Sequence, residues 1–323
     1  MSTLVAARAA TVSEYGGAVT GVANAHATWS SRRGLLLRLA GADGDGLGEA
    51  SPLPGYSPDD LAGCRRALEH LDPARLGLTV PADGAIVPDE LAAVLAPVPF
   101  PAARFAVETA LLDLAARRLG QPLWRLYADL YRQLAGAPDQ LVQLVEPAPV
   151  AVNAVCTELD PVPALAAMER AWARGVRCVK LKVGRDPARE LAVLQTARRS
   201  LGPELGLRVD ANGAWSVADA RVHLGRMAEI ALEYVEEPVR DPRAHLAALT
   251  PAPIPIALDE SLQPSAISDG ATSTRTVPAG TDAMANAAAN ADPDSWPEPA
   301  LRQGLAQVLI LKPMLLGGAL AAL

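Results

Sequence analysis

The segment Cys178-Val-Lys-Leu-Lys-Val-Gly184 decides how the rest of the chain is interpreted. Apolar residues alternate with Lys180 and Lys182 along it, and this period of two is typical of a β-strand. Because successive side chains of a strand point to opposite faces, the two lysines share one face and the apolar residues share the other. The segment therefore predicts a strand that presents two amines side by side.

Four later segments repeat the pattern of an apolar strand with a charged residue at its end. They are Leu207-Arg-Val-Asp210, Leu232-Glu-Tyr-Val-Glu236, Ile254-Pro-Ile-Ala-Leu-Asp259 and Val308-Leu-Ile-Leu-Lys312. Repeated strand–helix units predict a parallel sheet with right-handed crossovers. The charged side chains would then gather at the carboxyl ends of the strands, where (β/α)8 barrels carry their active sites.

The alternation of strands and helices begins near residue 149 and predicts an α/β fold, a TIM-type (β/α) barrel over residues 149–323. Only six strands can be counted, so we expect a barrel truncated after about six strands. Residues 264–299 are rich in Ala, Asp, Ser, Thr, Pro and Gly and have no periodicity. This composition predicts a low-complexity insertion within the barrel.

Residues 1–135 predict a separate α+β domain. Short strand-like runs such as Leu35–Leu39 alternate with loops, and two helices follow over residues 101–119 and 122–134. Gly120 stands where the first of these helices should end, because glycine readily adopts the left-handed conformation of a helix C-terminus. Residues 136–149 are expected to link the two domains.

Composition narrows the class of protein. Half of the 323 residues are hydrophobic, the net charge is −7 and the pI is about 5.2, which argues against nucleic acid or an anionic membrane as a partner. The three cysteines form no CxxC motif, which favours a reducing compartment. The sequence shows neither a long apolar run nor the order of a signal peptide, so we expect a cytoplasmic protein. The oligomeric state is not predicted.

Asp210, Glu236 and Asp259 predict a metal site with three carboxylates. Such an all-oxygen set suits a hard divalent cation, Mg²⁺ above all, and a cation would also relieve the repulsion among the acids. A single acid at a strand end is as readily explained as a helix N-cap, but three at regular intervals facing a lysine pair are not. Glu237 and Glu260 are alternatives in register, because each directly follows one of the three acids.

The lysines predict proton chemistry. Partial burial and the neighbouring ammonium of Lys180 disfavour the charged form of Lys182, which is therefore the candidate general base. Lys312 would lie across the barrel mouth from Lys182. Lys180 could instead form a structural ion pair with one of the acids. The chemistry that fits is abstraction of a proton next to a carboxylate, so the expected partner is a small-molecule carboxylate.

Asn212 lies just beyond the strand that ends at Asp210. It could contact the substrate or a metal-bound water, or it could be a turn or N-cap residue. The sequence leaves both interpretations open.

Five short motifs resemble the enolase superfamily and its muconate-lactonising subgroup. They are Lys180-Leu-Lys182, Val209-Asp210-Ala-Asn212, Val235-Glu236-Glu-Pro238, Leu258-Asp259-Glu-Ser261 and Leu311-Lys312-Pro with Gly317-Gly318. The resemblance implies that Lys182 is the base and selects Glu236 and Asp259 over their acidic neighbours as ligands. It also implies that residues 48–56 form the loop of an N-terminal α+β capping domain that closes over substrate, and that residues 106–114 lie in that domain's signature helix.

Within the subgroup, the motifs Ser51-Pro-Leu-Pro-Gly55 and Lys312-Pro-Met-Leu-Leu-Gly-Gly318 are most similar to o-succinylbenzoate synthases of menaquinone biosynthesis. This similarity implies a lyase that dehydrates 2-succinyl-6-hydroxy-2,4-cyclohexadiene-1-carboxylate, with Lys312 holding its charge against the ring and Asn212 and Gly317 binding substrate. N-acylamino acid racemases and dipeptide epimerases use the same parts, with Lys312 as second base. Because barrels of the family continue for two more strands, a truncated, non-catalytic product is the alternative of another class.

Overall fold

The computed structural model describes residues 3–23, 27–42, 44–81, 85–135, 150–263 and 296–322. The predicted linker, residues 136–149, lies outside the described residues, as does most of the predicted low-complexity insertion. The insertion's predicted end at residue 299 differs from the structure, because α10 (Glu298–Arg302) already begins at Glu298 and Trp296 packs against the core of the parallel sheet. The predicted domain bounds remain predictions.

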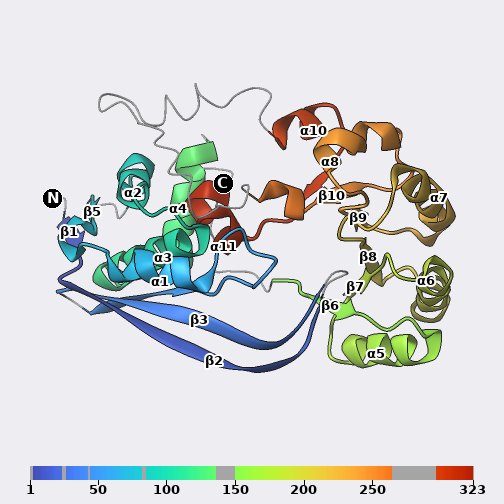
Figure 1. The fold of residues 1–323 in the computed structure, drawn as a ribbon, viewed down its shortest axis with the longest axis horizontal. Helices are drawn as coiled ribbons and strands as arrows, with labels where there is room; N and C mark the ends of the chain where they lie inside the picture. Colours follow the sequence, from blue (N-terminus) through green and yellow to red (C-terminus); the bar gives the residue numbers. More distant parts are fainter. Residues whose placement is uncertain are drawn as a thin grey trace.

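The N-terminal part is an antiparallel sheet covered by helices (Figure 1). The sheet consists of β2 (Ala9–Ala23), β3 (Thr28–Ala40) and β4 (Asp45–Ala50), and β1 (Thr3–Ala6) pairs separately with β5 (Gly77–Val80). The α-helices are α1 (Leu61–Glu69), α2 (Pro88–Leu95), α3 (Pro101–Leu119) and α4 (Leu123–Ala135). As predicted, α3 ends at Gly120, which has a φ of +63°.

Helix α3 lies unusually close to the sheet because β4 carries glycines on the face that it covers. A Cβ on Gly48 would lie only 1.9 Å from the carbonyl oxygen of Ala106, and one on Gly46 only 2.0 Å from that of Ala110. Alternate leucines of β3, beginning at Leu35, are completely buried in the same core. The core of the N-terminal part is therefore built between α3 and this sheet.

The second part is a parallel sheet with helices on its outside (Figure 1). Its strands follow the order β11-β10-β9-β8-β7-β6, so each strand lies beside its predecessor in the chain. They are β6 (Asn153–Cys156), β7 (Cys178–Lys182), β8 (Gly206–Asp210), β9 (Tyr234–Glu236), β10 (Ile256–Leu258) and β11 (Val308–Leu309). Within the described residues this confirms the prediction of an α/β fold with six barrel strands.

The connections between these strands are mainly helical. The longer helices are α5 (Pro161–Ala173), α6 (Pro187–Leu201) and α7 (Val217–Met227), and α8 (Pro242–His245) is a single turn. Asp186 and Ser216 cap α6 and α7, since their side chains accept the amide hydrogens of Arg189 and Asp219. Within the described ranges no helix has both the length and the apolar character needed to cross a membrane.

The alternation predicted for β7 is present and orients the lysines. Val179 and Leu181 are buried between the sheet and its outer helices, whereas Lys180 and Lys182 point to the inner face. The strand before Lys312 is shorter than predicted, because β11 ends at Leu309. Lys312 therefore lies in the segment that follows the strand.

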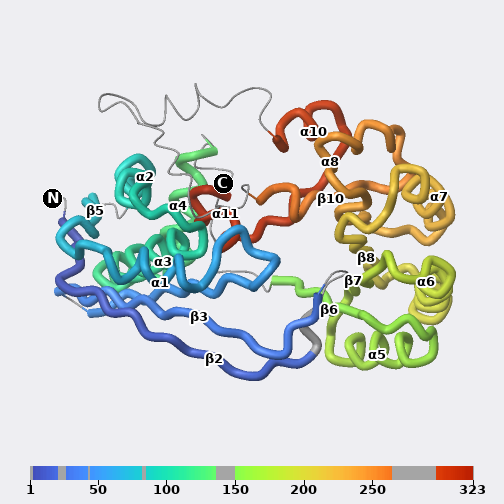
Figure 2. The backbone as a smooth tube through the Cα atoms, in the orientation of Figure 1, coloured from blue at the N-terminus to red at the C-terminus, as the bar shows by residue number. Residues whose placement is uncertain are grey.

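The chain leaves the parallel sheet after β11 and returns to the N-terminal part (Figure 2). Two short helices follow, α11 (Pro313–Leu316) and α12 (Ala319–Ala322). Met314 and Leu320 pack against the core of the N-terminal part. The last described segment therefore joins the two parts of the molecule.

Candidate active site

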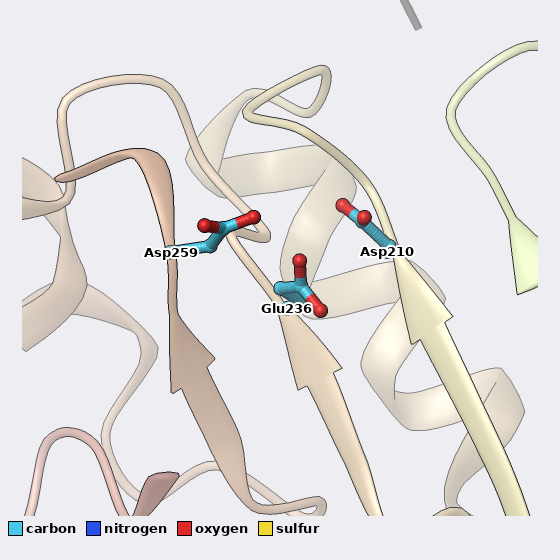
Figure 3. A group of neighbouring side chains, drawn as sticks. All are labelled: Asp210, Glu236 and Asp259. Carbon is cyan, nitrogen blue, oxygen red and sulfur yellow. The ribbon is translucent and has the colours of Figure 1, made fainter. Parts of the chain in front are cut away.

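Three carboxylates meet at the carboxyl ends of neighbouring strands. Asp210 ends β8, Glu236 ends β9 and Asp259 directly follows β10. Each offers an oxygen atom, and these atoms lie within 4.8 Å of one another (Figure 3). All three side chains are buried. The structure thus brings together the three acids that the sequence singled out.

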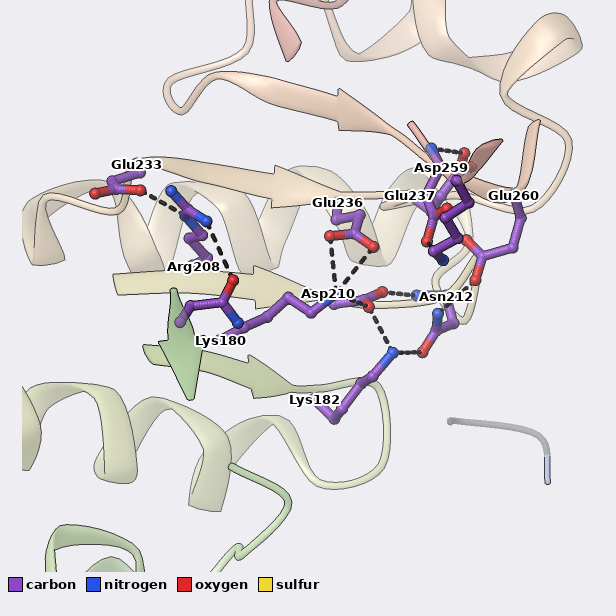
Figure 4. A network of polar contacts seen from close by, with 12 residues as sticks. Lys180, Lys182, Arg208, Asp210, Asn212, Glu233, Glu236, Glu237, Asp259 and Glu260 are labelled. Carbon is purple, nitrogen blue, oxygen red and sulfur yellow. Dashed lines mark hydrogen bonds and ion pairs between the residues drawn. The ribbon is translucent and has the colours of Figure 1, made fainter. Parts of the chain in front are cut away.

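The two lysines of β7 reach into this cluster (Figure 4). Lys180 Nζ lies 3.0 Å from Asp210 Oδ2 and 3.1 Å from both carboxylate oxygens of Glu236. Lys182 Nζ donates to Asp210 Oδ2 at 2.5 Å and to Asn212 Oδ1 at 3.0 Å. Lys180 therefore has the ion pairs that its structural interpretation requires, while Lys182 is paired with Asp210 and Asn212.

Burial and mutual repulsion shape the electrostatics of the cluster. Burial raises the pKa of Glu236 to about 9, and the charge of Asp210 adds to the shift. Burial would also raise the pKa of Asp210, but the charges of Lys180 and Lys182 outweigh it and hold that pKa below its ordinary value. A divalent cation would relieve the repulsion, and three buried carboxylates are the hard oxygen ligands that Mg²⁺ prefers. The residues present therefore fit a bound Mg²⁺ ion.

Lys312 contacts the cluster from the opposite edge of the sheet and also contacts the N-terminal part. Its amine donates to Asp259 Oδ2 and to the hydroxyl of Tyr56. The amine also lies 5.0 Å from the centroid of the Tyr56 ring, within the range of a cation–π contact. Burial, followed by the charge of Asp259, raises the pKa of Tyr56, which keeps this hydroxyl a hydrogen-bond donor. Tyr56 was not singled out from the sequence, although the loop that carries it was.

Asn212 connects Lys182 to a fourth acid. Its Oδ1 accepts from Lys182, and its Nδ2 donates to Glu260 Oε1 at 2.7 Å. Tyr56 also donates to Glu260 Oε1, at 3.3 Å. Burial raises the pKa of Glu260 to about 7, and the charge of Asp259 acts in the same direction. Asn212 has a φ of +46°, a conformation in which asparagine is tolerated better than most residues.

The acidic neighbours of the cluster have separate partners. Glu237 Oε1 accepts the backbone amides of Asp259 and Ser261 at 2.7 and 2.9 Å and the Ser261 hydroxyl at 2.6 Å. Glu237 thus holds the turn after β10, and Glu236 is the acid that faces Asp210. Gly317 is not brought to the cluster: it ends α11 and lies against the first turns of α3, next to Arg104.

A cavity of about 650 Å³ opens beside the cluster. Tyr56 lines it from the N-terminal part, and Asn212, Arg240, Arg243 and Glu260 line it from the segments that follow β8, β9 and β10. Both parts of the molecule therefore contribute to the space next to Asn212, whose Oδ1 accepts from Lys182.

One signal in the sequence would have identified the lysines at once. The chain has 29 lysines and arginines, but only three are lysines: Lys180, Lys182 and Lys312. All three contact the acidic cluster, and every other lysine-or-arginine position of the chain is an arginine. Arginine cannot lose its proton near neutral pH, whereas lysine can when its surroundings disfavour the charge.

Comparison with known proteins identifies the family. The family model described as enolase C-terminal domain-like matches residues 164–267. An o-succinylbenzoate synthase from Desulfotalea psychrophila is 32% identical over 270 residues, which cover 76% of this chain and 67% of that protein. The chain belongs to the enolase superfamily. An N-succinylamino acid racemase from Thermus thermophilus is 35% identical over 236 residues, 71% of this chain, and the match spans only 57% of that enzyme's length.

Solved structures of the enolase superfamily share the fold. Muconate lactonizing enzyme from Pseudomonas fluorescens, complexed with muconolactone, has a TM-score of 0.71 at 22% identity, over 98% of this chain and 76% of that one. The o-succinylbenzoate synthase from Thermosynechococcus elongatus, complexed with Mg in its active site, has a TM-score of 0.54 at 27% identity, over 78% of this chain and 68% of that one.

Proposed function

We propose that this member of the enolase superfamily is an o-succinylbenzoate synthase, a lyase of menaquinone biosynthesis that dehydrates 2-succinyl-6-hydroxy-2,4-cyclohexadiene-1-carboxylate. The observation that carries the proposal is the placement of two lysines on different acids of one cluster, Lys182 on Asp210 and Lys312 on Asp259. Two amines on either side of a metal-binding triad suit removal of a proton next to a carboxylate. The synthase of 32% identity supports the choice of substrate.

Asp210, Glu236 and Asp259 would hold the Mg²⁺ ion. When bound, the ion supplies positive charge for the substrate carboxylate, on which negative charge develops as the proton leaves. Lys180 stays charged in this scheme. Burial alone would lower its pKa, but the charges of Asp210 and Glu236 outweigh burial and raise it above the ordinary value. Lys180 thus orients two of the three acids.

Lys182 is the proposed base. As a neutral amine it takes the α-proton, and the C–H electron pair passes into the conjugated system of the substrate. The C–O bond at the ring hydroxyl then breaks, and the Lys182 ammonium returns the proton to the departing oxygen, so that one water molecule is released. Lys312 keeps its charge on the opposite side, where it offsets the negative charge of the ring system.

The second candidate is an N-succinylamino acid racemase or a dipeptide epimerase. The racemase of 35% identity favours it, and the same two lysines could protonate opposite faces of one carbon, with Lys312 as second base. Both candidates require the α-proton to be lost to an amine. They differ in whether a leaving group departs afterwards.

Parallel assays distinguish the candidates. Purified protein is incubated with the cyclohexadiene substrate and, separately, with an N-succinylamino acid of one configuration, each with Mg²⁺ and with EDTA. Metal-dependent loss of the diene absorbance without racemisation supports the synthase. Racemisation without dehydration favours the second candidate, and a folded protein inactive in both assays would favour a non-catalytic role.

Three free cysteines support the further proposal of a cytoplasmic location.

A further inference from the structure

Glu108, in the middle of α3, contacts the segment that follows Lys312. Its side chain is completely buried. The backbone amide of Ala319 donates to Glu108 Oε1 at 2.7 Å, and that of Leu320 donates to Oε2 at 3.2 Å. One carboxylate of the N-terminal part therefore accepts the first two amides of α12, which come from a segment more than 200 residues later in the chain.

The contact depends on a glycine. Gly318 has a φ of +131°, and a Cβ on it would lie only 2.1 Å from Glu108 Oε2. Any larger residue would be strained in this conformation and would also push against the carboxylate. At Gly317, by contrast, the nearest atom to a Cβ would be Arg104 Cδ at 3.5 Å, an ordinary contact. The approach is therefore tightest at Gly318.

Little chain separates this contact from Lys312. The carbonyl oxygen of Lys312 accepts the amide of Leu316 at 3.1 Å, and the carbonyl oxygen of Pro313 accepts the amide of Gly318 at 2.8 Å. The backbone between Lys312 and Gly318 is thus closed by its own hydrogen bonds into one compact turn. A shift of α12 on α3 would therefore be transmitted to Lys312.

We propose that Glu108 is a positioning residue for Lys312. Its carboxylate fixes residues 313–322 on α3, and this attachment sets where the Lys312 amine stands relative to Asp259 and Tyr56. The catalytic significance of this position rests on the proposed function, but the position itself does not. Two lines of geometry support it: the pair of amides on the carboxylate, and the glycine that lets the backbone reach it.

Removal of the carboxylate should release the segment. In Glu108→Ala the amides of Ala319 and Leu320 would lose their acceptor inside the protein, and a buried donor without a partner is unfavourable. The segment would then leave α3, and Lys312 would move with it. A displacement of about 1 Å at a catalytic group can reduce turnover about 100-fold.

The three lysines make the position of Lys312 directly measurable. Protein grown with [ε-¹³C]lysine should give three side-chain signals in the NMR spectrum, which Lys→Arg variants assign. In Glu108→Ala the Lys312 signal should move toward the position of free lysine, while those of Lys180 and Lys182 stay. Gly318→Ala should move the same signal, because its methyl group would push the backbone before α12 away from the Glu108 carboxylate. An unmoved Lys312 signal in both variants would overturn the proposal, whether or not the protein is a synthase.

Glu190 offers a matched control. It is also completely buried and accepts two backbone amides, those of Arg185 at 2.7 Å and Asp186 at 2.9 Å, but these amides belong to the segment between β7 and α6. Glu190→Gln should leave the Lys312 signal in place. If it moves that signal as far as Glu108→Gln does, the effect is a general loss of packing and the proposal fails. Glu108→Gln keeps the side-chain volume, and it decides the question if Glu108→Ala does not fold.

Kinetics give an independent readout once an activity is found. Because the metal ligands do not contact Glu108, Glu108→Gln and Glu108→Ala should lower kcat in that order, by up to about 100-fold, and leave Mg²⁺ affinity unchanged. Equal losses of kcat and Mg²⁺ affinity would instead indicate a collapsed site and contradict a role confined to Lys312.

Discussion

The amine of Lys180 lies 3.1 Å from both carboxylate oxygens of Glu236, although β8 separates their two strands. Lys180 crosses its neighbouring strand to do so and contacts Asp210 on the way. The lysine and the two acids therefore form one charged unit on the inner face of the sheet. A change in the charge of one member should therefore shift the pKa of the others.

Asp210→Asn should weaken Mg²⁺ binding by at least about tenfold. Loss of a residue that only hydrogen-bonds to a metal ligand typically lowers metal affinity 10–100-fold, and loss of a ligand should cost no less. Titration calorimetry with Mg²⁺ measures the change. Asp45→Asn is the control. Asp45 lies in β4 and its carboxylate pairs with Arg38, so this variant should bind Mg²⁺ as the wild type does. Equal affinity in wild type and Asp210→Asn would remove Asp210 from the metal site.

Binding of Mg²⁺ should release a proton below about pH 9. Because the pKa of Glu236 is about 9 in the metal-free protein, its carboxyl group holds a proton that the cation must displace. The apparent affinity should therefore rise with pH and level off above about 9. Calorimetry at about pH 8, above the pKa of about 7 of Glu260, in two buffers of different ionisation enthalpy measures the protons released, and Glu236→Gln should release none there. Proton release that persists in this variant at pH 8 would assign the proton to another group.

The metal-free protein should lose stability as the pH rises from 6 to 9. The folded-state pKa values of Glu236 and Glu260 lie above the ordinary value of 4.5, so the folded state binds protons more tightly than the unfolded state in this interval. The depressed pKa of Asp210 makes stability rise with pH instead, but only at acid pH. Thermal unfolding in EDTA measures the trend, and a midpoint that rises toward pH 9 would contradict it.

Tyr56→Phe should lower kcat/KM by roughly fivefold to tenfold, because it removes hydrogen bonds worth about 1 kcal/mol while the ring stays beside Lys312. Tyr56→Ala should have a larger effect, since the cation–π contact is lost as well. Tyr131→Phe, at an exposed position on α4, is the control for the loss of a hydroxyl. Equal kcat/KM values for Tyr56→Phe and Tyr131→Phe in steady-state kinetics would disprove a role for the Tyr56 hydroxyl.

Gly48→Ala should destabilise the N-terminal part by about 1–3 kcal/mol. The new methyl group would clash with the carbonyl oxygen of Ala106, which is held in place by the backbone of α3. Gly17→Ala is the matched control: it also lies in a strand, but a Cβ there meets no atom within 4 Å. Urea unfolding at a fixed Mg²⁺ concentration compares the two. Equal stability of the variants would mean that α3 does not need the glycine.

The sequence predicted the parts of the site that depend on local periodicity. Lys180 and Lys182 share a face because strand side chains alternate, and Asp210, Glu236 and Asp259 meet because parallel strands end at one edge. The contacts of Lys312 were not predictable in this way. Lys312 contacts Tyr56 across 256 positions of sequence, and the bond between Glu108 and Ala319 nearby spans 211 positions. Such a contact between a side chain and the backbone leaves no periodic pattern in the sequence.

The proposed role of Lys182 is to remove a proton next to a carboxylate in a metal-dependent reaction. Absorbance of the cyclohexadiene substrate should fall with wild-type protein and Mg²⁺, stay constant with EDTA, and fall at least 1,000-fold more slowly, to order of magnitude, with Lys182→Ala, a variant that should still bind Mg²⁺. Turnover by Lys182→Ala at the wild-type rate, or by wild type in EDTA, would contradict the account.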